Sequence, residues 1–502
     1  MYFFEIVIIF LSVICLFLTR FSVTTQRVLL STFLITIISQ LIFVGLRWQY
    51  YLIYLFFILK SISALFDFKS SKKFLRVIIS IKSFTLVLVS AGLLYIFPVP
   101  SFSAGEDTQY AVGYAEDHLV FEQRKNPTAF IELSNLQENT SRELLVDIYY
   151  PSLETASFNQ IVKSNEGNWG EYIVNYLNRT WELSLPKFIL SHLKLSSFEV
   201  ETGLRPVEDS KFPIVIYSHG WAGEKIFASD QLIHLAAKGY VVISVDHTGL
   251  AMFTDLPSGI ILNTGSTENS TSITSVMTEM ALDIEETISY YESFSSDSDI
   301  ATIVKNSADF TDVSIIGHST GGGAAVLYCE LNTCRTSVLQ DPFLTPFIYD
   351  AREINLRNKT AVIYSEDWYN GYLDSEELTE IEVFNTVLKI KDVEIDGYYM
   401  KDARHYDFVA FGSISPLAKY SFLKGSIEYA DSLSVNNYFN SIVIGGGIPD
   451  ESYSEYLVSI KNNDAKESEV MGALNKGNWF SIALVAVSCY GLVTWMLPET
   501  MK

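Results

Sequence analysis

Long apolar runs lie at both ends of the chain and enclose a more polar middle. They are Tyr2–Leu18, Val28–Leu46, Tyr50–Phe66, Val77–Phe97 and Trp479–Leu497. Each run approaches the ~20 apolar residues that an α-helix needs to cross a bilayer, and one cleaved signal peptide would not explain four of them. The pattern therefore predicts four transmembrane helices within residues 1–100 and a fifth at residues 478–498.

Basic residues beside these runs predict their orientation. Arg20 and Arg27 follow the first run, and the cluster Lys69–Arg76 follows the third, whereas the second connection is poor in such residues. Loops rich in Lys and Arg stay in the cytoplasm. We therefore expect an integral protein of the plasma membrane, with its N-terminus and the chain after Pro98 on the extracytoplasmic side.

The middle of the chain alternates between short apolar strands and helices. Strands are predicted at Tyr110–Glu122, Glu143–Tyr150, Ile214–Tyr217, Tyr240–Val245, Val313–Ile316, Ser337–Gln340, Ala361–Tyr364 and Val393–Met400. Helices are predicted at Asp230–Lys238, Val276–Phe294 and Gly322–Cys329. This alternation indicates an α/β domain with a mostly parallel sheet covered on both faces. We expect the domain at residues 110–460, with linkers at 101–109 and 461–477.

Charge divides the chain in the same way. Two of its 58 acidic residues and nine of its 35 basic residues precede residue 101. The remainder is therefore strongly acidic, which argues against nucleic acid as a partner. The four cysteines and seven histidines form no metal-binding motif, so neither a metal nor another cofactor is expected. Cys329 and Cys334 are the candidates for a disulfide.

The segment Gly317-His318-Ser319-Thr320-Gly321 carries the clearest chemical signal. It follows a predicted strand and opens a predicted helix rich in small residues. In this strand–turn–helix setting a G-x-S-x-G segment holds its serine on a sharp turn with the hydroxyl exposed. Ser319 is therefore the predicted nucleophile of an α/β-hydrolase fold.

A serine hydroxyl needs a base to take its proton, and an acid to orient that base. In this fold the order along the chain is Ser, acid, His, and His405 is the one histidine after Ser319. Two positions can supply the acid. Asp341 ends one predicted strand, and Glu366-Asp367 end the next, and position alone does not choose between them.

The oxyanion of the reaction needs two backbone N–H donors. One is expected from Thr320, directly after the nucleophile. The other is expected from Trp221, in the loop that follows the predicted strand Ile214–Tyr217. His219 in that loop is interpreted as a residue that holds the loop, and Asp246-His247 after the next strand is interpreted as structural.

Several motifs resemble the plasma-type (isoform II) platelet-activating factor acetylhydrolases, which are calcium-independent phospholipases A2. They are Ile148–Ser152 at a strand end, Phe212–Gly220 with its Ser-His-Gly, the elbow Gly317–Gly322, and His405–Phe408. The resemblance implies that the acid follows the strand after the nucleophile helix, which corresponds to Asp341. Thr320 and Trp221 depart from the family pattern, which has a phenylalanine and an aliphatic residue there.

Together these features predict a membrane-tethered serine esterase acting on acyl esters of phospholipids or lipid-like substrates, without a cofactor. Leu250–Phe253 and Ile260–Leu262 are either a hydrophobic access path for such a substrate or a plain surface loop. The alternative function is a dienelactone-hydrolase-like or polyester-hydrolase-like carboxylesterase acting on non-lipid esters. A third possibility is a non-catalytic ectodomain that senses or binds a partner.

Overall fold

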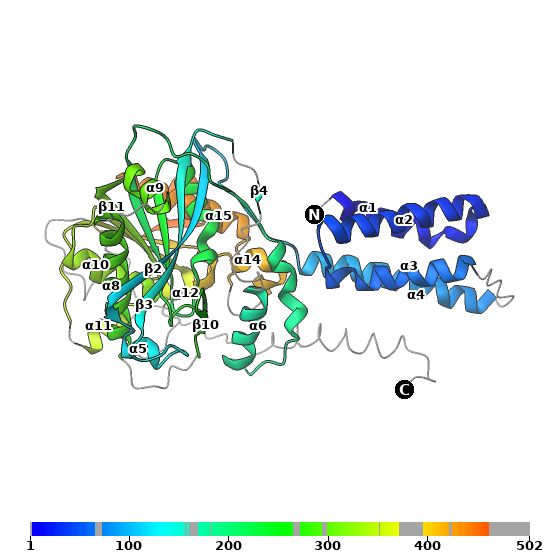
Figure 1. Ribbon diagram of the computed structural model, residues 1–502, viewed down its shortest axis with the longest axis horizontal. Coiled ribbons are helices and arrows are strands. Elements are labelled where there is room, and N and C mark those ends of the chain that lie inside the picture. Colours follow the sequence, from blue (N-terminus) through cyan, green and yellow to red (C-terminus); the bar gives the residue numbers. More distant parts are fainter. Residues whose placement is uncertain are drawn as a thin grey trace.

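The computed structural model has a helical bundle at one end of a large α/β domain (Figure 1). It describes residues 3–65, 73–155, 158–159, 169–180, 182–264, 272–293, 299–350, 352–370, 395–420 and 424–460. The predicted linker at 461–477 and the predicted C-terminal transmembrane helix at 478–498 lie outside the described residues.

A ten-stranded sheet forms the centre of the described α/β domain, in the order β15-β14-β13-β12-β11-β7-β8-β3-β2-β6. Its strands are β2 (Ala111–Lys125), β3 (Ser141–Ser152), β6 (Glu201–Thr202), β7 (Phe212–Ser218), β8 (Val241–Asp246), β11 (Ala308–His318), β12 (Thr336–Gln340), β13 (Lys359–Ser365), β14 (Ile395–Met400) and β15 (Leu457–Ser459). The six strands from β14 to β8 are parallel. The flanking strands β3 and β15 pair antiparallel to their neighbours. The predicted parallel sheet is therefore correct for the centre of the sheet.

Alternate residues of the central strands point into two separate hydrophobic cores. In β7, Ile214 and Ile216 pack into one core, while Val215 and Tyr217 pack into the other. This is the period of two expected for a strand that is buried on both faces. The sheet is therefore sandwiched between two helical layers.

Two pairs of helices cover the two faces of the sheet. α8 (Ile273–Ser293) and α10 (Thr320–Leu331) pack together on one face, and α7 (Ser229–Ala237) and α15 (Tyr429–Ile444) pack together on the other. The remaining helices are α5 (Thr128–Ile131), α6 (Trp169–Thr180), α9 (Asp299–Ser307), α11 (Thr345–Tyr349), α12 (Glu366–Tyr369) and α14 (Phe411–Ile414). In Figure 1, α6 and α14 lie between this domain and the bundle.

Two smaller sheets and several short 3-10 helices complete the described domain. β1 (Ser101–Phe102), β5 (Ser197–Glu199) and β4 (Phe158–Asn159) form a small sheet, and β9 (Phe253–Leu256) pairs with β10 (Gly259–Leu262). Leu250, Met252 and Phe253 are almost fully buried. The interpretation of Leu250–Phe253 as a surface loop or an open access path is therefore wrong, because these side chains belong to the core.

Each predicted N-terminal run forms a helix: α1 (Phe3–Leu16), α2 (Val23–Phe43), α3 (Tyr51–Leu65) and α4 (Lys73–Ile96). Within the described chain, α2 alone meets the length and apolar composition that a membrane-spanning helix needs. A signal sequence near the N-terminus would have the same length and composition. α1 and α3 have 14 and 15 residues, fewer than the ~20 needed to span a bilayer upright.

The connection between α2 and α3 joins the bundle to the α/β domain. The indole N–H of Trp48 donates to the carbonyl of Ile189, at 3.2 Å, in the 3-10 helix η3 (Lys187–Leu195). The Trp48 ring also packs edge-on against Phe97 and Phe188. Beside it, buried Arg47 pairs with buried Glu5 at 2.5 Å. The bundle and the domain therefore share a packed junction.

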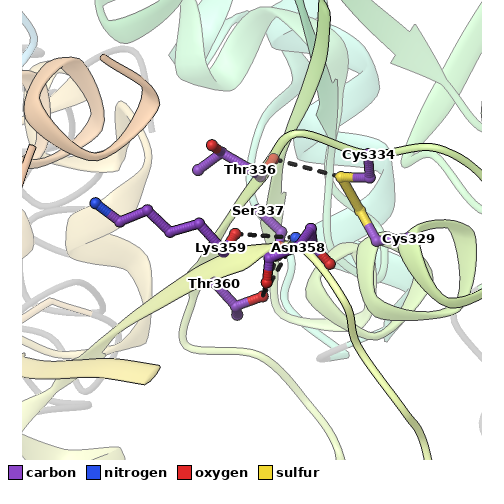
Figure 2. Close-up of a disulfide and its surroundings, with 7 residues drawn as sticks. All are labelled: Cys329, Cys334, Thr336, Ser337, Asn358, Lys359 and Thr360. Atoms are coloured by element: carbon purple, nitrogen blue, oxygen red, sulfur yellow. Dashed lines mark hydrogen bonds between the residues drawn. A yellow bond between two sulfur atoms is a disulfide. The ribbon is translucent and has the colours of Figure 1, made fainter. Parts of the chain in front are cut away.

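Cys329 and Cys334 form a disulfide between the end of α10 and the start of β12 (Figure 2). The Sγ atom of Cys334 also lies 3.5 Å from the carbonyl oxygen of Thr336. This bond closes a short loop at the end of α10 that is remote from Ser319.

Candidate active site

Ser319 lies at the turn between β11 and α10, with φ 57° and ψ −123°. This backbone region is populated almost only by glycine, and a residue with a side chain is strained there. Hydrogen bonds hold the turn on both sides: Ser319 N donates to Gln340 O at 3.0 Å, and Phe343 N donates to Ser319 O at 2.9 Å. The structure therefore has the sharp turn that the sequence predicted.

The glycines of the motif allow the close approach of backbone around Ser319. A Cβ atom on Gly317 would lie 2.3 Å from Gly321 O, and one on Gly321 would lie 2.1 Å from Ser218 O. Both distances are far too short for real contacts. The chain can form this turn only with glycine on either side of the serine.

His405 and Asp341 meet beside this turn. His405 begins the 3-10 helix η5 (His405–Phe408), and Asp341 directly follows β12. The distance from His405 Nδ1 to Asp341 Oδ2 is 3.1 Å. Asp341 also accepts hydrogen bonds from the backbone N–H of Ser365 at 2.5 Å and from its hydroxyl at 2.6 Å. The carboxylate is thus held in one orientation by groups other than the histidine.

The two alternative acids, Glu366 and Asp367, interact with groups other than His405. Asp367 pairs with Arg404 at 2.8 Å, and Glu366 accepts from the backbone N–H of Asp402 at 2.7 Å. The geometry therefore favours Asp341 as the partner of His405.

The surroundings of His405 keep its ring fixed and neutral. The Trp368 ring stacks on it with a centroid distance of 4.3 Å and an angle of 6°, and the His318 ring lies 4.6 Å away. Burial lowers the pKa of His405 below its ordinary value. A neutral imidazole at neutral pH can accept a proton, which is what a general base must do. Burial raises the pKa of Asp341, and the hydrogen bonds from Ser365 oppose that rise.

No hydrogen bond joins the Ser319 hydroxyl to His405 in the described part of the chain. Catalytic hydrogen bonds of this kind are often long in structures without substrate. The Ser319 side chain lies in a largely enclosed site, because the whole residue is 9% exposed.

Both candidate oxyanion donors lie next to Ser319. Thr320 is the first residue of α10, and the loop Ser218–Trp221 lies against the nucleophile turn, where a Cβ on Gly220 would come within 2.8 Å of Ser319 Cβ. Across the described residues, the backbone N–H groups of Trp221 and Thr320 donate no hydrogen bond. Free N–H donors beside a nucleophile can bind a developing oxyanion.

The described part of the chain contains no group of three His, Cys, Asp or Glu side chains that could hold a metal ion.

Comparisons with known proteins agree with this architecture. Residues 110–254 match the family model of platelet-activating factor acetylhydrolase, isoform II, and residues 201–397 match that of acetyl xylan esterase (AXE1). A solved structure, the ferulic acid esterase from Streptomyces cinnamoneus, superposes with a TM-score of 0.53 at 18% sequence identity. The match covers 72% of this chain and 99% of that one. This chain has the α/β-hydrolase fold. The matches support a carboxylic ester hydrolase, and a search of curated proteins found no match.

Sequence reasoning missed two residues of this candidate site. Trp368 covers His405, and Ser365 orients Asp341. Ser365 follows the predicted strand Ala361–Tyr364, so its place at the edge of the sheet gave a signal. Trp368 gave none, because its stacking depends on how α12 packs against η5.

Proposed function

We propose that this α/β-hydrolase is a membrane-tethered serine esterase that hydrolyses short acyl esters of lipid-like substrates. The observation that carries the proposal is the strained turn at Ser319 beside the pair His405–Asp341. Backbone strain of this kind persists only where the surrounding structure enforces it, and it clusters at active sites.

The proposed reaction proceeds through an acyl-enzyme. Ser319 Oγ attacks the ester carbonyl while its proton passes to His405 Nε2, and Asp341 stabilises the imidazolium that forms. The carbonyl oxygen becomes an oxyanion held by the N–H groups of Trp221 and Thr320. His405 then protonates the leaving alcohol. Water, deprotonated by the same histidine, releases the acid and restores Ser319.

The surface of the bundle supports its placement in a membrane. Most of the exposed large apolar side chains of the described residues belong to α1–α4, whereas charged Glu5 and Arg47 are buried inside. A soluble helix has the opposite arrangement, with its apolar side facing inward. α1 and α3, the helices that precede the predicted cytoplasmic loops in the sequence, both run away from the α/β domain (Figure 1).

Short acyl chains and lipid-like substrates are supported by different observations. The two matched families are an acetylhydrolase and an acetyl esterase by name. The bundle would keep the active site close to a lipid surface.

The acetyl xylan esterase match includes Ser319 and Asp341, whereas the other match ends before them. It therefore favours a second candidate, an esterase that removes acetyl groups from carbohydrate.

Labelling with a fluorophosphonate probe tests the core of the proposal. The detergent-solubilised full chain should be labelled, Ser319→Ala should not, and Ser289→Ala, on the exposed side of α8, should be labelled normally. Absence of labelling in the folded wild type would refute the proposed nucleophile. Hydrolysis rates with a short sn-2 acyl phospholipid, p-nitrophenyl acetate and acetylated xylan then rank the substrates. A preference for acetylated xylan over the phospholipid would replace the lipid assignment.

A further inference from the structure

A second Ser-His-Asp arrangement lies fully buried behind the candidate oxyanion loop. The Ser218 hydroxyl is 2.9 Å from His247 Nε2, and His247 Nδ1 is 3.0 Å from Asp283 Oδ2. All three side chains are inaccessible to solvent. They cannot contact a substrate, so their arrangement needs another explanation.

Charges around Asp283 determine the protonation of this group. Arg142 binds Asp283 through two hydrogen bonds of 2.6 and 3.0 Å, and Arg124 adds one of 2.7 Å. Although burial opposes ionisation, these two cations hold the pKa of Asp283 well below its usual range. An ionised Asp283 only accepts, so His247 carries its proton on Nδ1. His247 Nε2 then accepts a hydrogen bond from the hydroxyl of Ser218.

The network continues through the backbone of His247 to His219. The N–H of His247 donates to His219 Nε2 at 3.1 Å. His219 Nε2 must therefore be the acceptor nitrogen, which leaves the proton of the neutral ring on Nδ1. Burial, followed by the neighbouring His247, lowers the pKa of His219 to about 3, so this tautomer persists over the working pH range.

The last hydrogen bond reaches the peptide that contains the candidate oxyanion donor. His219 Nδ1 is 2.8 Å from the carbonyl oxygen of Gly220, and Gly223 N also donates to that oxygen at 2.9 Å. The Gly220 carbonyl and the Trp221 N–H belong to one planar trans peptide, so they point in opposite directions. Two hydrogen bonds on the carbonyl therefore fix the direction of the N–H.

We infer that His219 is a positioning residue that aims the Trp221 N–H at the oxyanion. Its tautomer is set by the backbone N–H of His247, a residue that Asp283 and Ser218 hold in place. This inference rests on the proposed function, because it assumes that Ser319 attacks an ester beside this loop. His219 acts through the peptide and does not touch the substrate.

Two substitutions at His219 test the inference. His219→Leu removes the donor to Gly220 O, whereas the side-chain N–H of His219→Asn can replace Nδ1–H. One oxyanion donor contributes ~10²–10³-fold to kcat, and a misaimed donor should lose part of it, so His219→Leu should lower kcat ~10–100-fold. KM should stay nearly constant, and His219→Asn should recover most of the loss. Binding of a trifluoromethyl ketone, which forms the tetrahedral adduct, should weaken in parallel with kcat.

His234→Leu is the matched control. His234 is also a buried histidine whose Nδ1 bonds to a backbone carbonyl, that of Ala104 at 2.6 Å, but it lies on α7 away from Ser319. The His234→Leu variant should be less stable than the wild type. Its kcat, calculated per active site titrated with the fluorophosphonate, should be unchanged. A wild-type kcat in folded His219→Leu would overturn the inference, while loss of activity in Ser319→Ala would still support the proposed function.

Ser218→Ala keeps the inference testable if His219→Leu fails to fold. It removes only the hydroxyl that bonds to His247 Nε2. The loss of one neutral hydrogen bond corresponds to a ~3–10-fold change when it is transmitted fully. A decrease of this size in kcat at constant KM supports the inference, and an unchanged kcat refutes it.

Discussion

The strain at Ser319 predicts an unusual ranking of two inactive variants. Ser319→Ala and Ser319→Gly both lack the hydroxyl, so both should be inactive. They differ in the Cβ atom, which makes the backbone at φ 57° and ψ −123° costly. Such a conformation costs ~1–3 kcal/mol for a residue with a side chain. The greater freedom of glycine in the unfolded chain offsets ~0.5–1 kcal/mol of that gain.

The expected result is that Ser319→Gly is the more stable protein by ~0.5–2 kcal/mol. For a domain of this size each kcal/mol corresponds to a Tm shift of ~2–4 °C. Thermal unfolding should be followed by intrinsic fluorescence in one detergent at one scan rate, because irreversible unfolding makes Tm depend on the rate.

The control pair is Ser289→Gly and Ser289→Ala, at an exposed position inside α8. Glycine there should be less stable than alanine by ~1 kcal/mol, the normal helix ranking. The two sites should therefore give opposite signs. If Ser319→Gly is no more stable than Ser319→Ala, the turn is not strained and the reasoning from its backbone is wrong.

Three further predictions concern the acid, the base and the disulfide. Asp341→Asn should lower kcat by ~10³–10⁴-fold, whereas Asp367→Asn, which breaks a pair with Arg404, should stay within ~10-fold; equal losses would contradict the assignment. Because burial lowers the pKa of His405, its neutral form persists below pH 6.5, and the acid limb of a kcat profile should lie below that value; a limb above pH 7 would contradict this. Replacing Cys329 by serine should cost about 2 kcal/mol, from the small loop closed by the bond, with unchanged kcat, because Cys329 lies ~14 Å along α10 from the nucleophile. Thermal unfolding followed by circular dichroism measures the loss of stability, and esterase rates with and without reductant measure kcat.

The sequence predicted the parallel centre of the sheet and the sharp turn at Ser319. Continuous apolar strands separated by helices can be recognised in the sequence without any tertiary information. The glycines on both sides of Ser319 likewise predict the sharp turn there. His405 was singled out because it is the one histidine after Ser319, and its role as the base stays a prediction. These features depend on short stretches of chain.

The features that sequence reasoning missed depend on packing between distant segments. The burial of Leu250–Phe253 could not be inferred, because an apolar stretch in a long connection reads equally as a core strand or a surface patch. Position alone left Asp341 and Asp367 open, since both follow neighbouring parallel strands. The ion pair of Asp367 with Arg404 distinguishes them, and it forms only in the assembled sheet. The link from Asp283 to His219 could not be inferred for the same reason, because it joins α8 to the loops that follow β8 and β7.

The junction at Trp48 changes what kind of support the bundle provides. An anchor connected by a loose linker would let the catalytic domain swing and search a volume of solvent above the bilayer. Here the ring of Trp48 is held between Phe97 and Phe188, and its N–H is bound to the backbone of η3. In the proposed topology the bundle is therefore a rigid support that fixes the distance of the active site from the bilayer and its tilt relative to it. Under the proposed function, lipid-like substrates would have to diffuse to this fixed point within the plane of the membrane. A soluble fragment without the bundle would then lose that geometry as well as its attachment.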